Sequence, residues 1–509
     1  MSPEFSASLA AWCRTLDPPA ARMVIFSSPD GFGGIAARAA QACGLGVEHA
    51  PTPIHPARAL AFLERTKADC AVLPVALLRA LLACDALALV DLSTLRRIFY
   101  EAPADAMLDA TEVKAARRLL GAEFAGFVAD LEPAAPIVAE AKALLEQDFA
   151  HLDFTKALHT LDALSHTALL SMLHGLSRSG LFSNPEARHT EDEILRTAQV
   201  ADAHRPLIRR WLRVLTEQGL LLRTGDAFHT AIAPLTYAEP TLERAWAELE
   251  ADWRLAMGSA GTIAYARRNA ERLPELLRGE QKAVHLLFPE GRTDLARALY
   301  RESVAARYQH HAVRALVGRV AAHWHAPRPL RILEVGAGTG ATSELLLPAL
   351  AGRDVDYLYT DVSAFFLNEA AERLRAYPFV RFDRYDIDVA PRAQGFAPHA
   401  FDVVIGGGVL NAARDTDASI RGLTQLLQSE GWLVLTEPTR EEFWVLASQA
   451  FMLGESSDGR ASTDTTFLSL PQWNAVLDRA GLCRVLGLPE EGHPLHRLGH
   501  RVFVARPRQ

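Results

Sequence analysis

Cysteine is scarce in this chain, and its few positions follow no pairing pattern. The 509 residues contain five cysteines, none of them in a CxxC pair. Disulfide frameworks and zinc sites both need cysteines at regular, paired spacings, so neither is expected, and no metal site is predicted. The five side chains are interpreted as ordinary core residues of a protein in a reducing compartment.

The chain also lacks an excess of positive charge and long apolar runs. It carries 53 Lys and Arg against 61 Asp and Glu, a formal charge of −8, so it offers no general field for nucleic acid. No window reaches about eighteen uninterrupted apolar residues, and the first residues, MSPEFSASLA, do not lead a basic stretch into an apolar core. We therefore expect a soluble, cytoplasmic protein with no membrane partner and no nucleic-acid partner.

The most informative stretch is Arg331 to Gly340, RILEVGAGTG, an apolar strand that breaks into three alternate glycines. Gly336, Gly338 and Gly340 have no Cβ, so they can take positive φ and let the backbone approach a ligand closely. The acidic Glu334 precedes them, and a carboxylate beside the turn suits a cationic ligand better than a diphosphate. The stretch predicts a ligand-binding turn between a strand and a helix.

Three later strands continue this pattern. The run YLYTD ends at Asp361, whose carboxylate can accept both hydrogen bonds of a ribose diol. The run FVRFDRYDID is expected to end a third strand at Asp386, followed by the apolar Ile387. A fourth strand is expected over Asp402 to Ile405, with a glycine turn that includes Gly407. These strand ends predict a ligand site along one edge of a parallel sheet.

Taken in order, these motifs resemble the class I methyltransferases that use S-adenosyl-L-methionine (SAM). Their first motif is an E/DxGxGxG strand and turn, and their fold is an α/β, Rossmann-like, seven-stranded sheet closed by an antiparallel hairpin. The resemblance implies SAM as the cofactor. It also implies that the cofactor lies against Glu334, Gly336, Gly338, Gly340, Asp361, Asp386, Ile387 and Gly407.

A more specific resemblance begins before the glycine turn. The run HLLFPEGRTDLARALY, then YQHHAVRAL, and later QGF and LSLPQW resemble the methyltransferase domains of polyketide synthases and nonribosomal peptide synthetases. This implies a role in natural-product biosynthesis on a small or carrier-protein-tethered substrate. Aromatic, His and Arg residues of the lead-in line the pocket in that family. The candidates here are Tyr300, Tyr308, His310 and His311, with plain helix packing as the alternative.

The chain departs from these relatives at one position. Their fourth strand is followed by VLHAT, whose histidine pairs with a glutamate at the end of the fifth strand to remove a proton. Here the segment reads VLNAARD, with Asn411 in place of the histidine, while Glu437 is kept. Asparagine cannot abstract a proton.

Three acceptors stay open: an amine nitrogen, an oxygen of low pKa, or an activated carbon. In the last case another group would take the proton, for which His310, His311, Glu437 and His399 are candidates. Asn411 could equally only end the short helix before Arg414.

The region before the catalytic domain divides into two expected parts. Residues 151–238 give three helical patterns followed by the hairpin GLLLRTGDAFHT, an order typical of a winged helix. Arginines on and beside its third helix make DNA binding one candidate function of this region. The alternatives are a dimer surface and a substrate lid. Residues 239–324 are expected to form a helical lid or linker, and residues 325–509 the methyltransferase domain.

Residues 1–150 alternate short apolar runs with helical patterns and are expected to form a small α/β module. The stretch ALALVDLSTLRRIFYEAPADAM faintly resembles a part of adenylate-forming enzymes. Neither the phosphate loop nor the catalytic lysine segment of that family is found, so we interpret the module as a vestigial remnant or a docking unit.

An insertion over residues 440–466 follows the fifth strand. It starts with the aromatic Phe443 and Trp444 and continues into a polar stretch of Gly, Ser, Asp and Thr. Such a segment suits either a substrate lid or a loosely ordered loop.

The leading hypothesis is a free-standing SAM-dependent methyltransferase, for which a homodimer is one expected assembly. The alternatives are a winged-helix regulator that senses a metabolite, and a SAM-binding protein without activity.

Overall fold

The computed structural model describes residues 9, 21–27, 32–50, 54–102, 108, 110–128 and 134–508. The chain divides into two compact units, Met1–Pro136 and Ile137–Gln509. None of the helices in the described part of the chain combines the length and the apolar character needed to cross a bilayer.

The first unit is built on a five-stranded, wholly parallel sheet in the order β2-β1-β3-β4-β5. Alternate residues of its strands point to opposite faces, so Val24 and Ile25 belong to two separate apolar clusters. The strands are β1 (Arg22–Ile25), β2 (Gly46–His49), β3 (Cys70–Pro74), β4 (Arg97–Ala102) and β5 (Glu123–Val128). The helices between them are α2 (Phe32–Ala42), α3 (Pro56–Thr66), α4 (Val75–Leu82) and α5 (Ala110–Leu120).

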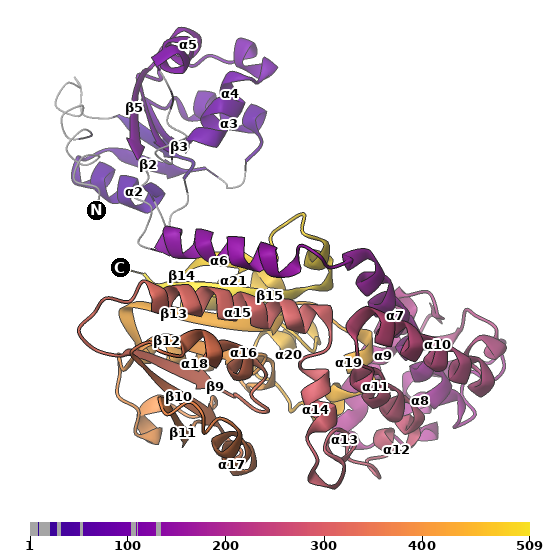
Figure 1. Ribbon diagram of the computed structural model, residues 1–509. Coiled ribbons are helices and arrows are strands. Elements are labelled where there is room, and N and C mark those ends of the chain that lie inside the picture. The colour runs from indigo at the N-terminus through magenta and orange to yellow at the C-terminus, as the bar shows by residue number, and fades with distance from the viewer. Residues whose placement is uncertain are drawn as a thin grey trace. The chain divides into compact units, whose positions relative to one another are not determined.

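The second unit contains the expected seven-stranded sheet, in the order β11-β10-β9-β12-β13-β15-β14 (Figure 1). The first five strands of this order are parallel, and β15 is antiparallel to both of its neighbours. The strands are β9 (Leu330–Val335), β10 (Val355–Asp361), β11 (Val380–Arg384), β12 (Phe401–Gly407), β13 (Leu427–Pro438), β14 (Leu482–Leu488) and β15 (His500–Pro507).

The centre of this sheet fixes where a ligand can bind. The strand order reverses between β9 and β12, and in open α/β sheets the crevice at such a switch point is the usual binding place. The third strand ends at Arg384, so Asp386 lies in the loop that follows rather than at the strand end. The helices along the sheet are α16 (Ala341–Leu350), α17 (Ala364–Arg373), α18 (Thr416–Leu426) and α21 (Leu470–Arg479).

The helix α6 (Ala134–Phe149) belongs to the second compact unit from Ile137 onward, although we expected all of it within the N-terminal module. It runs beside α15 (Val304–Ala322) along the sheet (Figure 1). Glu140 pairs with Arg319 at 3.2 Å, and Asp148 pairs with His311 at 2.8 Å. These contacts join residues far apart in the chain, which is why local patterns did not reveal them.

Residues 151–238 contain the expected three helices and hairpin, with a short extra strand. The order is α7 (Phe154–Ser177), β6 (His189–Thr190), α8 (Glu191–Thr197), α9 (Arg205–Glu217), β7 (Leu221–Thr224) and β8 (Ala227–Thr230). The three strands form one small sheet in the order β6-β8-β7. Further helices follow: α10 (Glu239–Met257), α11 (Gly261–Glu271), α12 (Leu273–Leu277), α13 (Ala283–Leu287) and α14 (Asp294–Leu299).

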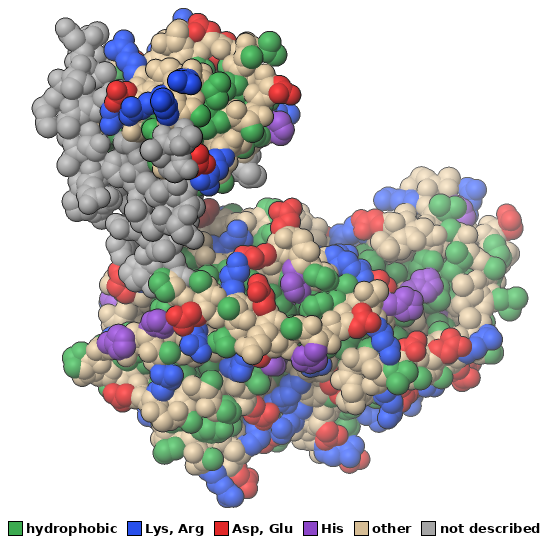
Figure 2. Space-filling view, turned by 45° about the horizontal axis from the view of Figure 1, so that its top comes forward, with side chains coloured by type: hydrophobic (Ala, Val, Ile, Leu, Met, Phe, Trp, Pro, Cys, Tyr) green, Lys and Arg blue, Asp and Glu red, His purple; other side chains and the backbone are tan. Residues whose placement is uncertain are grey.

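The arginines of α9 are paired with carboxylates of this same chain. Arg209 contacts Glu191 at 2.7 Å, and Arg210 contacts Asp464 at 2.9 Å. Arg213 donates a 2.8 Å hydrogen bond to the backbone oxygen of Asp464 as well. Over the face of residues 137–509 that Figure 2 shows, basic and acidic side chains are interspersed rather than gathered by sign. The helix therefore does not present a bare row of guanidinium groups.

A buried carboxylate ties β9 to β12 at the amino end of the strands. Asp402 is 4% exposed and accepts hydrogen bonds from both terminal guanidinium nitrogens of Arg328, at 2.6 and 2.7 Å. The backbone nitrogen of Arg331 donates to it at 3.0 Å. Burial opposes the charge, but these partners hold the pKa of Asp402 below its ordinary value. The aspartate is therefore expected to stabilise the sheet in its ionised form.

We predict that Asp402→Asn lowers the free energy of unfolding by about 2 kcal/mol, because an amide cannot balance two partly buried guanidinium groups. The matched control is Asp356→Asn, which breaks an exposed pair with Arg381 on the same sheet and should cost under about 1 kcal/mol. Urea unfolding followed by tryptophan fluorescence measures both, since every tryptophan except Trp12 lies in the second unit. Equal losses in the two variants would contradict the prediction.

Candidate functional site

A cavity of about 760 Å³ opens at the carboxyl end of the central strands. Its lining comes from the turns after β9, β10 and β12, from the segment between α14 and α15, and from the insertion after β13. Its size is that of a site for a small-molecule ligand. Glu334, Gly336 and Gly338 of the predicted motif therefore face the same cavity as the residues of the insertion, whereas Gly340 does not line it and lies against Arg373 and Tyr359.

The glycine turn has the geometry that the sequence predicts. Gly336, Gly338 and Gly340 all have positive φ, at 59°, 55° and 73°, a region that side chains disfavour. A Cβ atom on Gly336 would also collide with the side chain of Val409. On the facing turn, a Cβ on Gly407 would stand 2.9 Å from Thr342 Oγ1. The two turns approach each other closely because Gly336 and Gly407 have no side chains at the points of contact.

Glu334 lines the cavity but is held from behind by two hydroxyl groups. Tyr357 donates to its carboxylate at 2.7 Å, and Ser343 donates a short hydrogen bond to the same oxygen. Burial raises the pKa of Glu334 to about 7, although these donors oppose the shift. The side chain is therefore fixed in place under the glycine turn.

Two guanidinium groups hold the glycine turn from outside, and the sequence did not reveal them. The backbone oxygen of Thr339 accepts from Arg301 at 3.0 Å and from Arg373 at 2.8 Å. Glu344 pairs with both arginines, at 2.9 and 2.8 Å. These residues come from three separate elements, so only the fold brings them together.

Asp361 lies where the sequence places it, at the end of β10 and against the glycine turn. Its two carboxylate oxygens accept from the backbone nitrogens of Gly338, at 2.9 Å, and Ser363, at 2.8 Å. Burial raises the pKa of this carboxyl, and the backbone donors oppose the shift. Asp386 and Ile387 line the same cavity further along the edge of the sheet.

Asn411 and Glu437 form a pair under the turn after β12. Glu437 is fully buried and accepts from the backbone nitrogen of Leu410 at 2.7 Å and from Asn411 Nδ2 at 3.1 Å. The same Nδ2 donates to the backbone oxygen of Gly408 at 2.7 Å. Both protons of the amide nitrogen are therefore used, which leaves Oδ1 as the free group of Asn411. Glu437 does not line the cavity, whereas Asn411 does.

The polar half of the insertion clamps this turn, so it is not a loosely attached loop. Arg460 is 3% exposed and donates short hydrogen bonds to the backbone oxygens of Asn411 and Ala413. Asp458 contacts Arg460 at 2.7 Å and accepts from the backbone nitrogen of Thr416 at 2.9 Å. Burial opposes its charge, but these donors hold the pKa of Asp458 below its ordinary value. The insertion thus fixes the position of Asn411.

His310 faces the cavity with both ring nitrogens engaged. Nε2 lies 2.8 Å from the backbone oxygen of Tyr300, so it carries the proton, and Nδ1 accepts from Thr342 Oγ1 at 3.1 Å. Burial lowers the pKa of His310 to about 4, and the ring is neutral near pH 7. Tyr300 also lines the cavity, as the sequence predicts.

Three other candidates do not reach this cavity, and for them the sequence interpretation was wrong. Tyr308 and His311 lie on the other side of α15, where both rings contact Phe149. Tyr308 lines a second cavity of about 440 Å³. His399 lies before β12, at the opposite edge of the sheet, with Nδ1 2.7 Å from the backbone oxygen of Leu427. None of the three can act on a ligand at the glycine turn.

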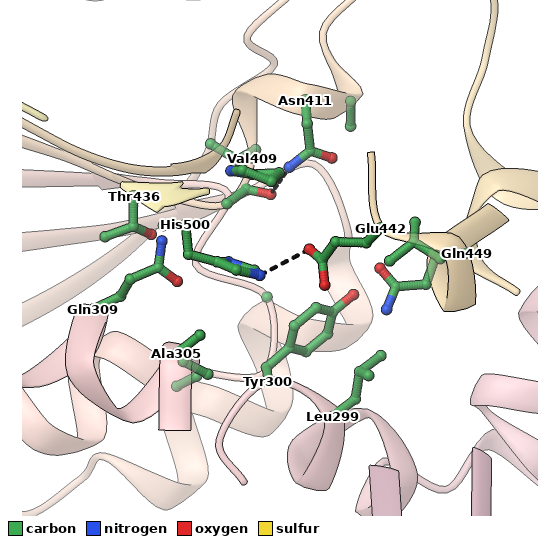
Figure 3. Close-up of a pocket in the computed structure, with 18 of the residues that line it drawn as sticks. Leu299, Tyr300, Ala305, Gln309, Val409, Asn411, Thr436, Glu442, Gln449 and His500 are labelled. Carbon is green, nitrogen blue, oxygen red and sulfur yellow. Dashed lines mark hydrogen bonds and ion pairs between the residues drawn. The ribbon is translucent and has the colours of Figure 1, made fainter. Parts of the chain in front are cut away.

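The structure adds a titratable pair that the sequence interpretation missed. Nε2 of His500 lies 2.8 Å from a carboxylate oxygen of Glu442, and both residues line the cavity. Figure 3 shows the two side chains pointing toward each other beside Tyr300. Trp444 donates to the other oxygen of Glu442 at 2.9 Å, and with Phe443 it lines the same wall. The pair forms because β15 runs antiparallel to β13, opposite Pro438.

This strand order, with a glycine turn after the central strand and an acidic residue ending the next strand, defines a class I methyltransferase fold. A family model described as a methyltransferase domain matches residues 333–433.

Pyochelin synthetase PchF of Pseudomonas aeruginosa is 35% identical over 349 residues, which cover 68% of this chain and 19% of that protein. Polyketide synthase ThaG of Burkholderia thailandensis is 40% identical over 305 residues, which cover 59% of this chain and 5% of that protein. The chain thus spans about a fifth or less of these relatives. The crystal structure of the CurJ carbon methyltransferase matches with a TM-score of 0.67 and 28% identity, covering 73% of this chain and 99% of that chain. The chain is a SAM-dependent methyltransferase that resembles the methyltransferase domains of polyketide synthases and nonribosomal peptide synthetases.

The buried Glu437 gives a pH-dependent stability. Burial raises its pKa to about 7 from the ordinary 4.5, so the folded chain holds this proton more tightly than the unfolded chain. Its contribution is full below about pH 4.5 and is lost as the pH rises through about 7. Between about pH 5 and pH 8 the native chain should therefore lose about 3 kcal/mol relative to Glu437→Gln, in which this group does not titrate.

Urea unfolding at the two pH values measures this difference. The control is Glu271→Gln, an exposed glutamate on α11, which should leave the pH dependence of unfolding unchanged. A native chain and a Glu437→Gln variant with parallel pH profiles would contradict the prediction.

Proposed function

We propose that this chain transfers the methyl group of SAM to an acceptor in polyketide-type or nonribosomal-peptide-type biosynthesis. The acceptor is a small molecule or a group tethered to a carrier protein. One observation carries the proposal: a single cavity joins the glycine turn and Asp361 to Asn411 and the aromatic wall of the insertion. A cofactor half and an acceptor half thus share one cavity.

The residues of the cofactor half fit SAM. Gly336, Gly338 and Gly407 line the cavity, and their turns offer backbone rather than side chains to the ligand. Each oxygen of Asp361 is anchored by one backbone donor and keeps a lone pair for a ribose hydroxyl. Asp386 and Ile387 line the cavity further along the edge, and in this proposal they meet the adenine. Bound SAM supplies an electrophilic methyl group on a sulfonium.

In the acceptor half, Asn411 orients the acceptor rather than activating it. Its Nδ2 is held by Gly408 and Glu437, so Oδ1 can accept a hydrogen bond from an N–H or O–H of the acceptor. Tyr300, Phe443 and Trp444 line the surrounding wall, and an acceptor bound against them would displace water from it. Displacement at a methyl group depends mainly on such positioning and on desolvation.

A carrier-tethered acceptor is supported by the relatives, since PchF is named a synthetase and ThaG a polyketide synthase. In this proposal residues 151–238 form a winged-helix-like region, residues 239–324 form a helical lid or linker, and the N-terminal unit is a vestigial remnant or a docking unit. The alternative of a DNA-binding regulator is not favoured, because Arg209, Arg210 and Arg213 pair with carboxylates of this chain.

We predict that Asp361→Ala weakens SAM binding at least 100-fold, since it removes the carboxylate that supports the turn and meets the ribose. Isothermal titration with SAM measures the change. Asp383→Ala, which removes an exposed carboxylate from the neighbouring strand, should bind SAM as the native chain does. Unchanged affinity in Asp361→Ala would overturn the assignment of the cofactor half.

We predict that Asn411→Ala lowers kcat by about 10- to 100-fold and leaves the SAM dissociation constant unchanged, because the acceptor loses its orienting oxygen. The assay follows demethylated SAM with carrier-tethered or thioester acceptors. Asn184→Ala, in an exposed loop, is the control and should keep full activity. If Asn411→Ala instead lost SAM binding and kept kcat, the residue would belong to the cofactor half.

A further inference from the structure

Methyl transfer to an atom that bears a proton requires a group to receive that proton. Asn411 cannot do so, and Glu437 is sealed behind it with no exposure to the cavity. His310 uses both ring nitrogens in hydrogen bonds within the protein. Asn411, Glu437 and His310 therefore do not provide a base for this step.

The pair of His500 and Glu442 has the geometry that this step needs. Glu442 holds Nε2 of His500 at 2.8 Å and is itself held by Trp444. No residue in the described part of the chain hydrogen-bonds to Nδ1 of His500, and that atom is not enclosed by protein. One ring nitrogen is thus oriented by a carboxylate, and the other is open to a ligand in the cavity.

We propose that His500 is the general base of the methyl transfer, and that Glu442 orients its ring and stabilises its protonated form. This inference rests on the proposed function. Nδ1 of neutral His500 takes the proton from the acceptor atom as that atom bonds to the methyl carbon. The electron pair of the carbon–sulfur bond goes to sulfur, and the positive charge ends on the imidazolium beside Glu442.

The proposal defines the class of acceptor. The nucleophilic atom carries a dissociable proton, as in a carbon between two carbonyl groups or in an amine. Figure 3 places His500 between Asn411 and Tyr300, so an acceptor held by Asn411 lies within the space that the histidine borders. Gln309 lines the same cavity; its Nε2 donates to the backbone oxygen of Arg501 at 3.1 Å, which leaves Oε1 for a further polar contact.

Charged groups from several elements act on His500. Glu442 belongs to the insertion, Glu437 to β13, and Arg501 to the same strand as His500. Arg440 in turn lowers the pKa of Glu442. Burial alone would lower the pKa of His500, but Glu442 and, more weakly, Glu437 raise it above its ordinary value against the effect of Arg501. The rate of transfer should therefore rise with pH through a pKa above about 6.5.

The first test compares His500→Ala with the native chain, using the acetoacetyl thioester of N-acetylcysteamine and a prolyl thioester as carbon and nitrogen acceptors. We expect kcat to fall about 100-fold or more, the rising limb of the pH profile to disappear, and added imidazole to restore part of the rate. The SAM dissociation constant should not change. His496→Ala, which removes a neighbouring ring outside the cavity, is the control.

Activity with one thioester and not the other identifies the acceptor atom. A native rate and pH profile in His500→Ala would overturn the inference and leave the proposed function standing. Failure of the native chain to bind SAM would overturn the proposed function itself. A rate that falls as the pH rises would show a protonated His500 at work, which also contradicts the inference.

A second measurement needs no acceptor. Histidine labelled with nitrogen-15 reports the titration of His500, assigned by its loss in His500→Ala. The pKa should lie above about 6.5 in the native chain and fall in Glu442→Gln, where the attracting carboxylate is gone, while Glu442→Asp restores part of the shift. An unshifted titration, or one that Glu442→Gln leaves unchanged, would overturn the pairing.

Discussion

The turn after β12 depends on two buried side chains, Glu437 and Arg460, that hydrogen-bond to its backbone. Glu437 accepts hydrogen bonds from the backbone nitrogen of Leu410 and from the side-chain amide of Asn411. Arg460 donates hydrogen bonds to the backbone oxygens of Asn411 and Ala413. A buried polar side chain without hydrogen-bond partners would be costly at either place, so both side chains stay bound to the turn. The position of Asn411, and with it the boundary between the two halves of the cavity, follows from this arrangement.

The same arrangement makes the insertion a structural part of the site. Asp458 and Arg460 secure one end of its polar segment to the turn, and Asp464 secures the other to Arg210 and Arg213 of α9. Trp211 of α9 also donates to the backbone oxygen of Leu446 at 3.0 Å. Movement of the wall that carries Phe443 and Trp444 would therefore have to involve residues 151–238 as well.

Local signals predicted the sheet and the glycine turn because strand periodicity and the glycines are properties of short segments. Side-chain direction on α15 was harder, although residues three apart share a helical face: Tyr308 and His311 point one way and His310 the other. The pair of His500 and Glu442 had no local signal, since it depends on the pairing of β15 with β13.

Asn411 stands where the resembling domains have a histidine. In the acceptor half, the orienting role and the proton-accepting role then fall to different residues, and neither role is lost. A histidine at this position would take both the orienting and the proton-accepting role, with Glu437 behind it. Here the glutamate fixes an amide, which can only orient, and a second carboxylate, Glu442, fixes an imidazole on the adjoining strand. The two functions are then carried by separate side chains of one wall, and the proton leaves the acceptor on the side of β15.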